Sequence, residues 1–339
     1  MKIKNLILET PFFLAPMEAV NCTSFRLLCK QRGASLVYTD MIDADLFMEN
    51  IKELGELETI KKLINPIKEE KPLAIQLGGS NIKNLISTLK IVEPFADLID
   101  YNAGCPLGYM LGKKGGCYLM KHPIQLYKII SELRKSTILP LTVKLRSGWD
   151  KESINILDIA KELEKLKIDA IAIHPRTRKQ GYKNKSDWNL VRQVKKNISI
   201  PVILSGDVTN VYQAHMAFLH TKCDAIMIAR GAKNNPSIFK YLNKYWISKT
   251  NNNLNLNKKN QTSLLTKPNT VYDKKVLDIK KDFFEFLDLY EKYESRNKLS
   301  EIKDHGLWLV RELRTSSILK QKILKSSSKK ELSLLFSKI

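Results

Sequence analysis

The feature that most constrains the fold is an alternation of short, apolar, β-branched runs with amphipathic stretches, from the N-terminus to about residue 245. The runs predict strands, and the stretches between them have apolar residues near the 3.6-residue period of a helix. The predicted strands are Phe12–Ala15, Leu36–Thr39, Leu73–Leu77, Leu98–Asn102, Leu141–Leu145, Ala170–His174, Val202–Ser205 and Ala225–Ala229. The predicted helices are Thr23–Arg32, Ile82–Val92, Pro123–Lys135, Ile154–Leu166, Asp187–Lys196 and Val211–Leu219.

Eight strands, each followed by helix, within just under 250 residues fit an α/β fold of the (β/α)8 TIM-barrel type. A doubly wound open sheet is the alternative arrangement of such units. The glycine-rich GxGxxG turn that binds dinucleotides in that fold follows none of the predicted strands. We therefore predict a barrel over residues 1–247.

The chain changes character after the barrel. Residues 248–273 are rich in Asn, Lys and Ser and predict a polar linker or long surface loop. Helical periodicity returns at Lys274–Ser295, Glu301–Ser316 and Lys329–Ser337. We expect residues 274–339 to form a small all-helical domain.

The net charge is +22, from 57 Lys and Arg against 35 Asp and Glu. Residues 246–339 hold 20 basic and 11 acidic side chains, so the C-terminal part is the more positive per residue. Such an imbalance destabilises a compact chain through self-repulsion unless a polyanion binds it, which favours a nucleic-acid partner. The alternative explanation is a Lys- and Asn-rich composition that serves solubility alone.

Targeting and metal signals point to a cytoplasmic protein with no membrane segment and no metal. The sequence has no apolar run near the roughly 18 residues that span a bilayer, and Met1–Asn5 begins no signal peptide. The five Cys residues include no CxxC pair and no Cys/His spacing typical of zinc, so we expect reduced thiols.

One thiol stands where a barrel places its chemistry. The stretch Tyr101–Pro106 ends the fourth predicted strand, and its glycine and proline turn the chain sharply at Cys105. Sites in this fold lie at the carboxyl ends of the strands. Asn102 carries an amide donor and acceptor, which suits holding an amide-like ring edge beside an acid–base group. Taken alone, Cys105 would more often be a small buried hydrophobe.

The other strand ends carry polar groups that together describe one ligand. Lys144 lies within an apolar strand, where a buried ammonium needs an anionic or electron-rich partner. Gly206 and Gly231 follow strands seven and eight, where barrels bind phosphate, although tight turns alone also explain them. A phosphate there and a polar, electron-accepting ring across Gln76, Lys144 and His174 outline a flavin mononucleotide (FMN). The same rim includes Pro16, Met17, Glu18, Ser205, Asp207, Ala229 and Arg230.

Over essentially its whole length the sequence resembles the tRNA-dihydrouridine synthase family. The matching motifs are Ala15–Met17 with Phe25–Arg26, Gln76–Leu77, Asn102–Pro106, Val143–Trp149, Ile173–Thr177 and the turn Gly206–Asp207. The resemblance implies an FMN-binding barrel with a C-terminal helical domain that helps to hold tRNA. It also implies NADPH-driven reduction of the C5–C6 bond of a uridine to dihydrouridine. We expect a monomer, although the sequence leaves the oligomeric state open.

By this resemblance, reduced FMN passes hydride to C6 and Cys105 protonates C5 as a general acid. A thiol with an unperturbed pKa of about 8.5 is mostly protonated near neutrality. Asn102 and Arg176 would then contact the uridine, and Lys144 and His174 the flavin. The predicted mouth residues, which would meet RNA, are Arg176, Arg178, Lys179 and Tyr182.

Several positions depart from the usual family pattern. Cys22 replaces a common Asp, Tyr109 a common Lys, Ser205 an Asn and Ala229 a Gly. Cys117 is a second thiol near the site, and we prefer Cys105 because it lies at the strand end. Two other classes of protein stay open: a flavin oxidoreductase for free pyrimidines, and a tRNA-binding protein without turnover. Neither a small substrate nor an idle site explains both the +22 charge and the set of strand-end groups.

Overall fold

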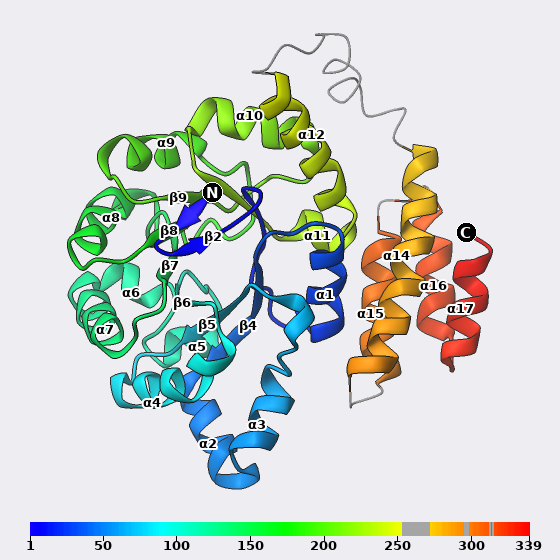
Figure 1. Ribbon diagram of the computed structural model, residues 1–339, viewed down its shortest axis with the longest axis horizontal. Helices are drawn as coiled ribbons and strands as arrows, with labels where there is room; N and C mark the ends of the chain where they lie inside the picture. The colour runs from blue at the N-terminus through cyan, green and yellow to red at the C-terminus, as the bar shows by residue number, and fades with distance from the viewer. Residues whose placement is uncertain (253–271, 295–297, 312, 314) are drawn as a thin grey trace.

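The computed structural model describes residues 1–252, 272–294, 298–311, 313 and 315–339. Its largest element is an all-parallel barrel (Figure 1). The barrel strands are β3 (Phe12–Leu14), β4 (Val37–Asp43), β5 (Leu73–Gly78), β6 (Leu98–Ala103), β7 (Leu141–Arg146), β8 (Ala170–His174), β9 (Val202–Leu204) and β10 (Ala225–Ile228). They pair in the order β3-β10-β9-β8-β7-β6-β5-β4, and a bridge between Phe13 and Leu36 joins β3 to the chain entering β4. All eight predicted strands are confirmed.

Helices surround the barrel (Figure 1). They are α1 (Thr23–Gln31), α2 (Ala44–Leu54), α3 (Glu56–Leu63), α4 (Ile82–Val92), α5 (Gly108–Gly112), α6 (Tyr118–Lys121), α7 (Pro123–Ser136), α8 (Ile156–Lys165), α9 (Trp188–Asn197), α10 (Val211–Thr221), α11 (Arg230–Asn234) and α12 (Ile238–Asn252). The six predicted helices are present. The pair α2–α3 was not predicted; Asp43 caps α2 by accepting from the amides of Asp45 and Leu46, and Gly55, at φ +78°, separates α2 from α3.

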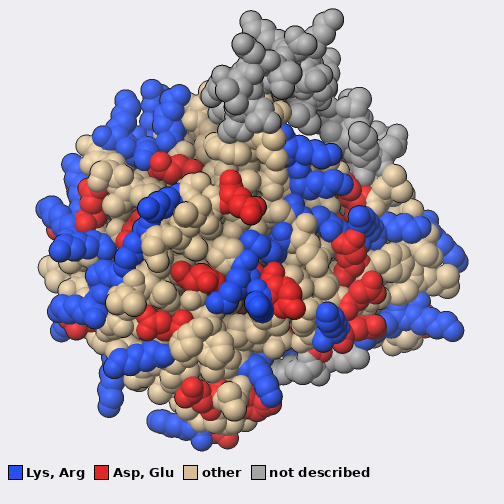
Figure 2. Space-filling model, in the orientation of Figure 1, with Lys and Arg blue, Asp and Glu red and all other residues tan. Residues whose placement is uncertain are grey.

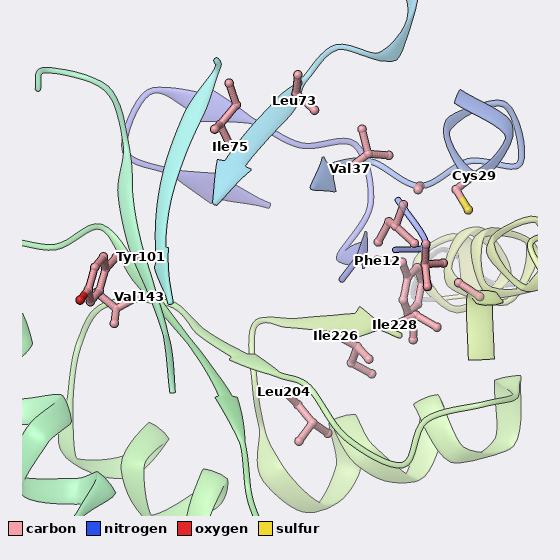
Figure 3. Packing of buried hydrophobic residues seen from close by; sticks show 14 of the residues in the cluster. Phe12, Cys29, Val37, Leu73, Ile75, Tyr101, Val143, Leu204, Ile226 and Ile228 are labelled. Atoms are coloured by element: carbon pink, nitrogen blue, oxygen red, sulfur yellow. The ribbon is translucent and has the colours of Figure 1, made fainter. Parts of the chain in front are cut away.

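Side chains alternate between two apolar layers because both faces of each strand are buried. The outer layer packs between strands and helices, and Figure 3 shows Val37, Leu73, Tyr101 and Val143 within it. Inside the barrel, a smaller apolar cluster fills the end where the strands begin. The N-terminal hairpin, β1 (Lys2–Ile3) with β2 (Leu6–Ile7), lies across this end and adds Ile3 and Leu8 to the cluster. The opposite end of the interior is polar, and it holds the candidate site.

The C-terminal helices pack as a separate layer beside α1 (Figure 1). They are α14 (Tyr272–Tyr293), α15 (Leu299–Leu309), α16 (Ser316–Lys325) and α17 (Lys329–Ser337). Arg32, which follows α1, forms ion pairs with Asp282 at 2.6 Å and Glu285 at 2.5 Å, so the domain is anchored to the barrel. Helix α16 was not predicted; Ile323 is its one fully buried residue, which leaves little helical periodicity to detect.

The predicted polar linker, 248–273, falls mostly outside the described residues. Where the structure describes it, α12 continues to Asn252, past the predicted barrel end at residue 247. No helix within the described ranges combines the length and apolar composition needed to cross a bilayer.

Candidate active site

A cavity of about 420 Å³ opens at the carboxyl ends of the barrel strands. Almost all of the residues predicted from the strand ends line this cavity. They are Pro16, Met17, Glu18, Gln76, Asn102, Cys105, Lys144, His174, Ser205, Gly206, Asp207, Ala229 and Arg230. Arg176 and Arg178 do not line this cavity.

Cys105 is the thiol that reaches the cavity. It is partly exposed there, while Cys117 is fully buried and donates to the carbonyl of Gly104 at 3.1 Å. Burial raises the pKa of the Cys105 thiol above its ordinary value, and the nearby carboxylate of Glu18 raises it further. The thiol therefore stays protonated at neutral pH, as a proton donor requires.

Asn102 positions the chain around this thiol. Its Oδ1 accepts from the amide of Gly104 at 3.0 Å and from the amide of Cys105 at 2.8 Å. Its Nδ2 donates to Oε1 of Gln76 at 2.8 Å. Gly104 itself approaches the backbone of β7 so closely that an added Cβ would lie 3.2 Å from the carbonyl carbon of Leu145. The turn that carries Cys105 is thus held from both sides.

Lys144 brings an ammonium group into the cavity with no hydrogen bond or ion pair to the described residues. Burial lowers the pKa of Lys144, and the positive charge of Arg146 lowers it further, while Asp100 opposes the shift. A desolvated cation that forms no hydrogen bond with the described residues, and that Asp100 balances only in part, is well suited to an electron-rich ring that gains negative charge. This observation fits the flavin that the sequence implied.

His174 is buried and surrounded by cations. Its pKa lies well below the ordinary value, because of burial first and then the charges of Arg146, Lys144 and Arg176. A guanidinium nitrogen of Arg176 lies 3.2 Å from His174 Nε2. Since arginine can only donate, Nε2 of the neutral imidazole is the acceptor.

The loops after β9 and β10 form a narrow cradle. A Cβ added at Gly231 would lie 3.0 Å from both Thr209 Cα and the carbonyl oxygen of Val208, so only glycine fits here without displacing the backbone. The first amides of α11 have no intrahelical acceptor, and Arg230 adds a cation beside them. Such a cradle fits the phosphate of a flavin mononucleotide.

The structure changes the interpretation of Arg176. We predicted that it faces substrate; its side chain is 3% exposed and lines a wider hollow beside the cavity rather than the cavity itself. It forms an ion pair with Asp207 at 2.6 Å and donates to the carbonyl of Asn184, also at 2.6 Å. Arg230 binds the other oxygen of Asp207 at 3.0 Å. Asp207 thus links the loops after β8, β9 and β10. Burial raises its pKa, but the hydrogen bonds from the Ser186 amide and from Arg176 outweigh that effect and lower it.

Of the other predicted mouth residues, only Tyr182 lines the cavity. Arg178 lies over the ring of Trp149, 4.8 Å from its centroid, and Lys179 pairs with Asp150 at 3.0 Å. A second, wider hollow of about 930 Å³ adjoins the first and shares Tyr182 and Arg230 with it.

Among the charged residues at this end of the barrel, four were not predicted as site residues: Asp100, Arg146, Lys233 and Arg311. Asp100 and Arg146 had a detectable signal, because each alternates with apolar residues in a buried strand. Arg146 donates to the carbonyls of Gly104, Thr177 and Gly181, which fixes the loop after β8. Arg311 comes from the helical domain and had no local signal.

Two departures from the family pattern make defined contacts. Tyr109 donates to Glu18 Oε1 at 3.3 Å across the cavity mouth. Cys22 lies with its Sγ 3.8 Å from Nε2 of His305, so it belongs to the contact between barrel and helical domain.

Comparison with known proteins agrees with this geometry. The family model described as Dihydrouridine synthase (Dus) matches residues 13–337. The chain belongs to the dihydrouridine synthase family. It is 33% identical over 243 residues to tRNA-dihydrouridine synthase B of Pasteurella multocida, covering 71% of each chain. It is 32% identical over 246 residues to tRNA-dihydrouridine synthase B of Escherichia coli K12, covering 72% of this chain and 75% of that protein.

A solved structure shares the fold of this family member. A variant of NCR from Zymomonas mobilis superposes with a TM-score of 0.50 at 16% identity, covering 74% of this chain and 90% of that one. At this identity the likeness concerns the barrel architecture alone.

Proposed function

We propose that this chain is a tRNA-dihydrouridine synthase that reduces the C5–C6 bond of a uridine, with FMN as its bound cofactor and NADPH as reductant. The observation that carries the proposal is the cavity itself. It combines the protonated thiol of Cys105, the unpaired ammonium of Lys144, the neutral imidazole of His174 and the cradle at Gly231. The names of the relatives at 30–34% identity support the substrate.

Different residues of the cavity have different roles in the proposed reaction. When bound, reduced FMN supplies a hydride to C6 of the uracil ring. The thiol of Cys105 donates the proton to C5, and its raised pKa keeps that proton available. Lys144 stabilises negative charge on the ring system, and neutral His174 contributes hydrogen bonding without adding a charge. Asn102 holds the Cys105 turn and aligns the pyrimidine.

The basic surface supports tRNA as the substrate. Figure 2 shows Lys and Arg side chains over both the barrel and the helical domain on the face viewed. At the cavity mouth, Arg230 and Lys233 from the barrel meet Arg311 from the helical domain. Cations from two domains around one mouth suit the phosphate backbone of a folded RNA whose uridine enters the cavity.

The decisive experiment is a single turnover of the chemically reduced, FMN-loaded protein on unmodified tRNA. We expect the wild type to form dihydrouridine, and Cys105→Ala to do so far more slowly. Cys117→Ala is the matched control, because this thiol does not line the cavity, and it should retain turnover. Rapid flavin oxidation by free uracil or orotate with tRNA inert would assign the protein to the small-pyrimidine oxidoreductases. A protein that binds tRNA but no flavin would be a binding protein without turnover.

A further inference from the structure

A continuous chain of hydrogen bonds runs from a buried carboxylate to the backbone of Cys105. Asp100 Oδ2 accepts from Gln76 Nε2 at 2.6 Å, and Gln76 Oε1 accepts from Asn102 Nδ2 at 2.8 Å. Asn102 Oδ1 then accepts from the amide of Cys105 at 2.8 Å. Asp100 is fully buried, and Gln76 is 1% and Asn102 8% exposed.

The strand register builds this chain. Gln76 on β5 is paired with Asp100 on β6, and Asp100 is paired with Thr142 on β7. Asn102 lies two residues beyond Asp100, so both point into the barrel interior. Thr142 Oγ1 donates to the second oxygen of Asp100 at 2.5 Å. Both carboxylate oxygens are therefore acceptors.

The direction of every bond in the chain follows from the carboxylate. An ionised Asp can only accept, so the NH2 group of the Gln76 amide must face it. The Gln76 oxygen then faces Asn102, which turns the Asn102 NH2 toward Gln76 and its oxygen toward the amides of Gly104 and Cys105. With both amide oxygens occupied, Gln76 and Asn102 present N–H groups rather than carbonyls to a ligand in the cavity.

Asp100 also acts on the charge of the site. Its carboxylate raises the pKa of Lys144 against the effects of burial and Arg146. Asn102 is paired with Lys144 in the sheet, so the two side chains point into the barrel interior from neighbouring strands. Removing the carboxylate would leave less negative charge to balance the positive charges of Lys144 and Arg146, in a region of low dielectric.

We propose that Asp100 is a positioning residue of this active site. Its carboxylate fixes the orientation of the Gln76 and Asn102 amides and, through them, the turn that carries Cys105. Its negative charge also offsets part of the positive charge beside the flavin, so it tunes the reduction potential. This inference deepens the proposed function and rests on it for the identity of the cofactor.

The test compares the holoenzyme with Asp100→Asn and with Thr142→Val. The Asn variant keeps the side-chain shape but removes the charge that orders the chain. The Val variant removes one bond to Asp100 and leaves the link through Gln76 intact. For Asp100→Asn we expect exchange of the Gly104 and Cys105 amides to rise about ten-fold, and kcat to fall about ten-fold with KM for tRNA unchanged. The flavin midpoint potential should rise, because a negative charge is lost. Thr142→Val removes one of the two bonds to Asp100 but keeps the carboxylate, so it should shift amide exchange, kcat and the flavin potential in the same directions as Asp100→Asn, by a smaller amount.

Hydrogen exchange and the potential do not depend on tRNA turnover. If neither the wild type nor any variant reduced tRNA, the proposed function would be wrong. The exchange and potential measurements would still test the role of Asp100. The proposal would be overturned if Asp100→Asn kept the amide exchange rates and the flavin midpoint potential of the wild type and showed only a lower melting temperature. Should Asp100→Asn not fold, Gln76→Met breaks the same chain one link later. Faster exchange at Gly104 and Cys105 in that variant supports the proposal, and unchanged exchange overturns it.

Discussion

Arg26 and Glu70 form a buried ion pair with two bonds, Nε to Oε2 at 2.6 Å and Nη2 to Oε1 at 2.9 Å. Their side chains are 2% and 0% exposed. Arg26 lies on α1, and Glu70 on the short helix η1 (Lys68–Glu70) that precedes β5. Because α1 also packs against α14, this pair fixes the helix on which the C-terminal domain rests.

Breaking this pair should destabilise the fold. Arg26→Met keeps much of the side-chain volume but leaves the Glu70 carboxylate buried without its cation. We expect the free energy of unfolding to fall by about 3–5 kcal/mol, measured by urea denaturation. The double variant Arg26→Met/Glu70→Met should recover part of the loss, since no uncompensated charge remains. Equal destabilisation of the single and double variants would contradict this account.

Arg311 should contribute to tRNA binding rather than to chemistry. It is exposed at the cavity mouth, on the side formed by the helical domain. Arg311→Ala should weaken tRNA binding and reduce the salt slope of log K by about one, the value for one lost phosphate contact. Single-turnover reduction at saturating tRNA should change little. Lys161→Ala, an exposed cation on α8, is the matched control, and an equal effect of both variants would argue against a specific contact.

The raised pKa of Cys105 predicts the pH profile of the reaction. A general acid works only while protonated, so a pKa above the ordinary value extends activity toward higher pH. The single-turnover rate of the pre-reduced enzyme should stay level through the range in which an ordinary thiol, pKa about 8.5, loses its proton. Cys105 alkylation, followed by site-resolved mass spectrometry, should accelerate only above that range. A rate that declines from pH 7 upward would contradict a raised pKa for the group that donates the proton.

His305 should make the protein sensitive to acid. It packs between Phe286 and Phe25, with ring centroids at 4.1 and 5.1 Å. Burial lowers its pKa to about 3, and the charge of Lys233 adds to the effect. The unfolded chain binds a proton near pH 6.5 and the folded one does not, so stability present above pH 6.5 is lost as the pH falls toward 3.

The comparison variant for this prediction is His305→Phe, which keeps the aromatic packing. Between pH 6.5 and 4.5 the wild type should lose up to about 1.4 kcal/mol per pH unit relative to the variant, measured by urea denaturation. The difference between the two proteins is the informative quantity. Burial raises the pKa of Asp40 and Asp100 to about 6, and these groups favour the folded state as the pH falls. Parallel stability curves would contradict the role of His305.

Much of the site could be predicted because strand β7 has a local pattern. Leu141, Val143 and Leu145 face the helices, and Thr142, Lys144 and Arg146 face the interior. The period of two is visible in the sequence, so Lys144 could be placed in the site. The same pattern in β6 places Asp100 inside the barrel. Its role in the site depends on its hydrogen bond from Gln76, which lies on a different strand.

By itself the sequence determined the eight strands, the position of Cys105 at the end of one of them, and the presence of a basic helical domain. Those features depend on residues close together in the chain. The tertiary structure alone decided that Arg176 serves Asp207, that Asp100 reaches Cys105 through two amides, and that Arg311 meets the barrel mouth. These contacts join residues from separate strands, loops and domains, and Arg32 and Asp282 meet across 250 positions. No local sequence pattern predicts such contacts, because they form only when the barrel closes and the C-terminal helices pack against α1.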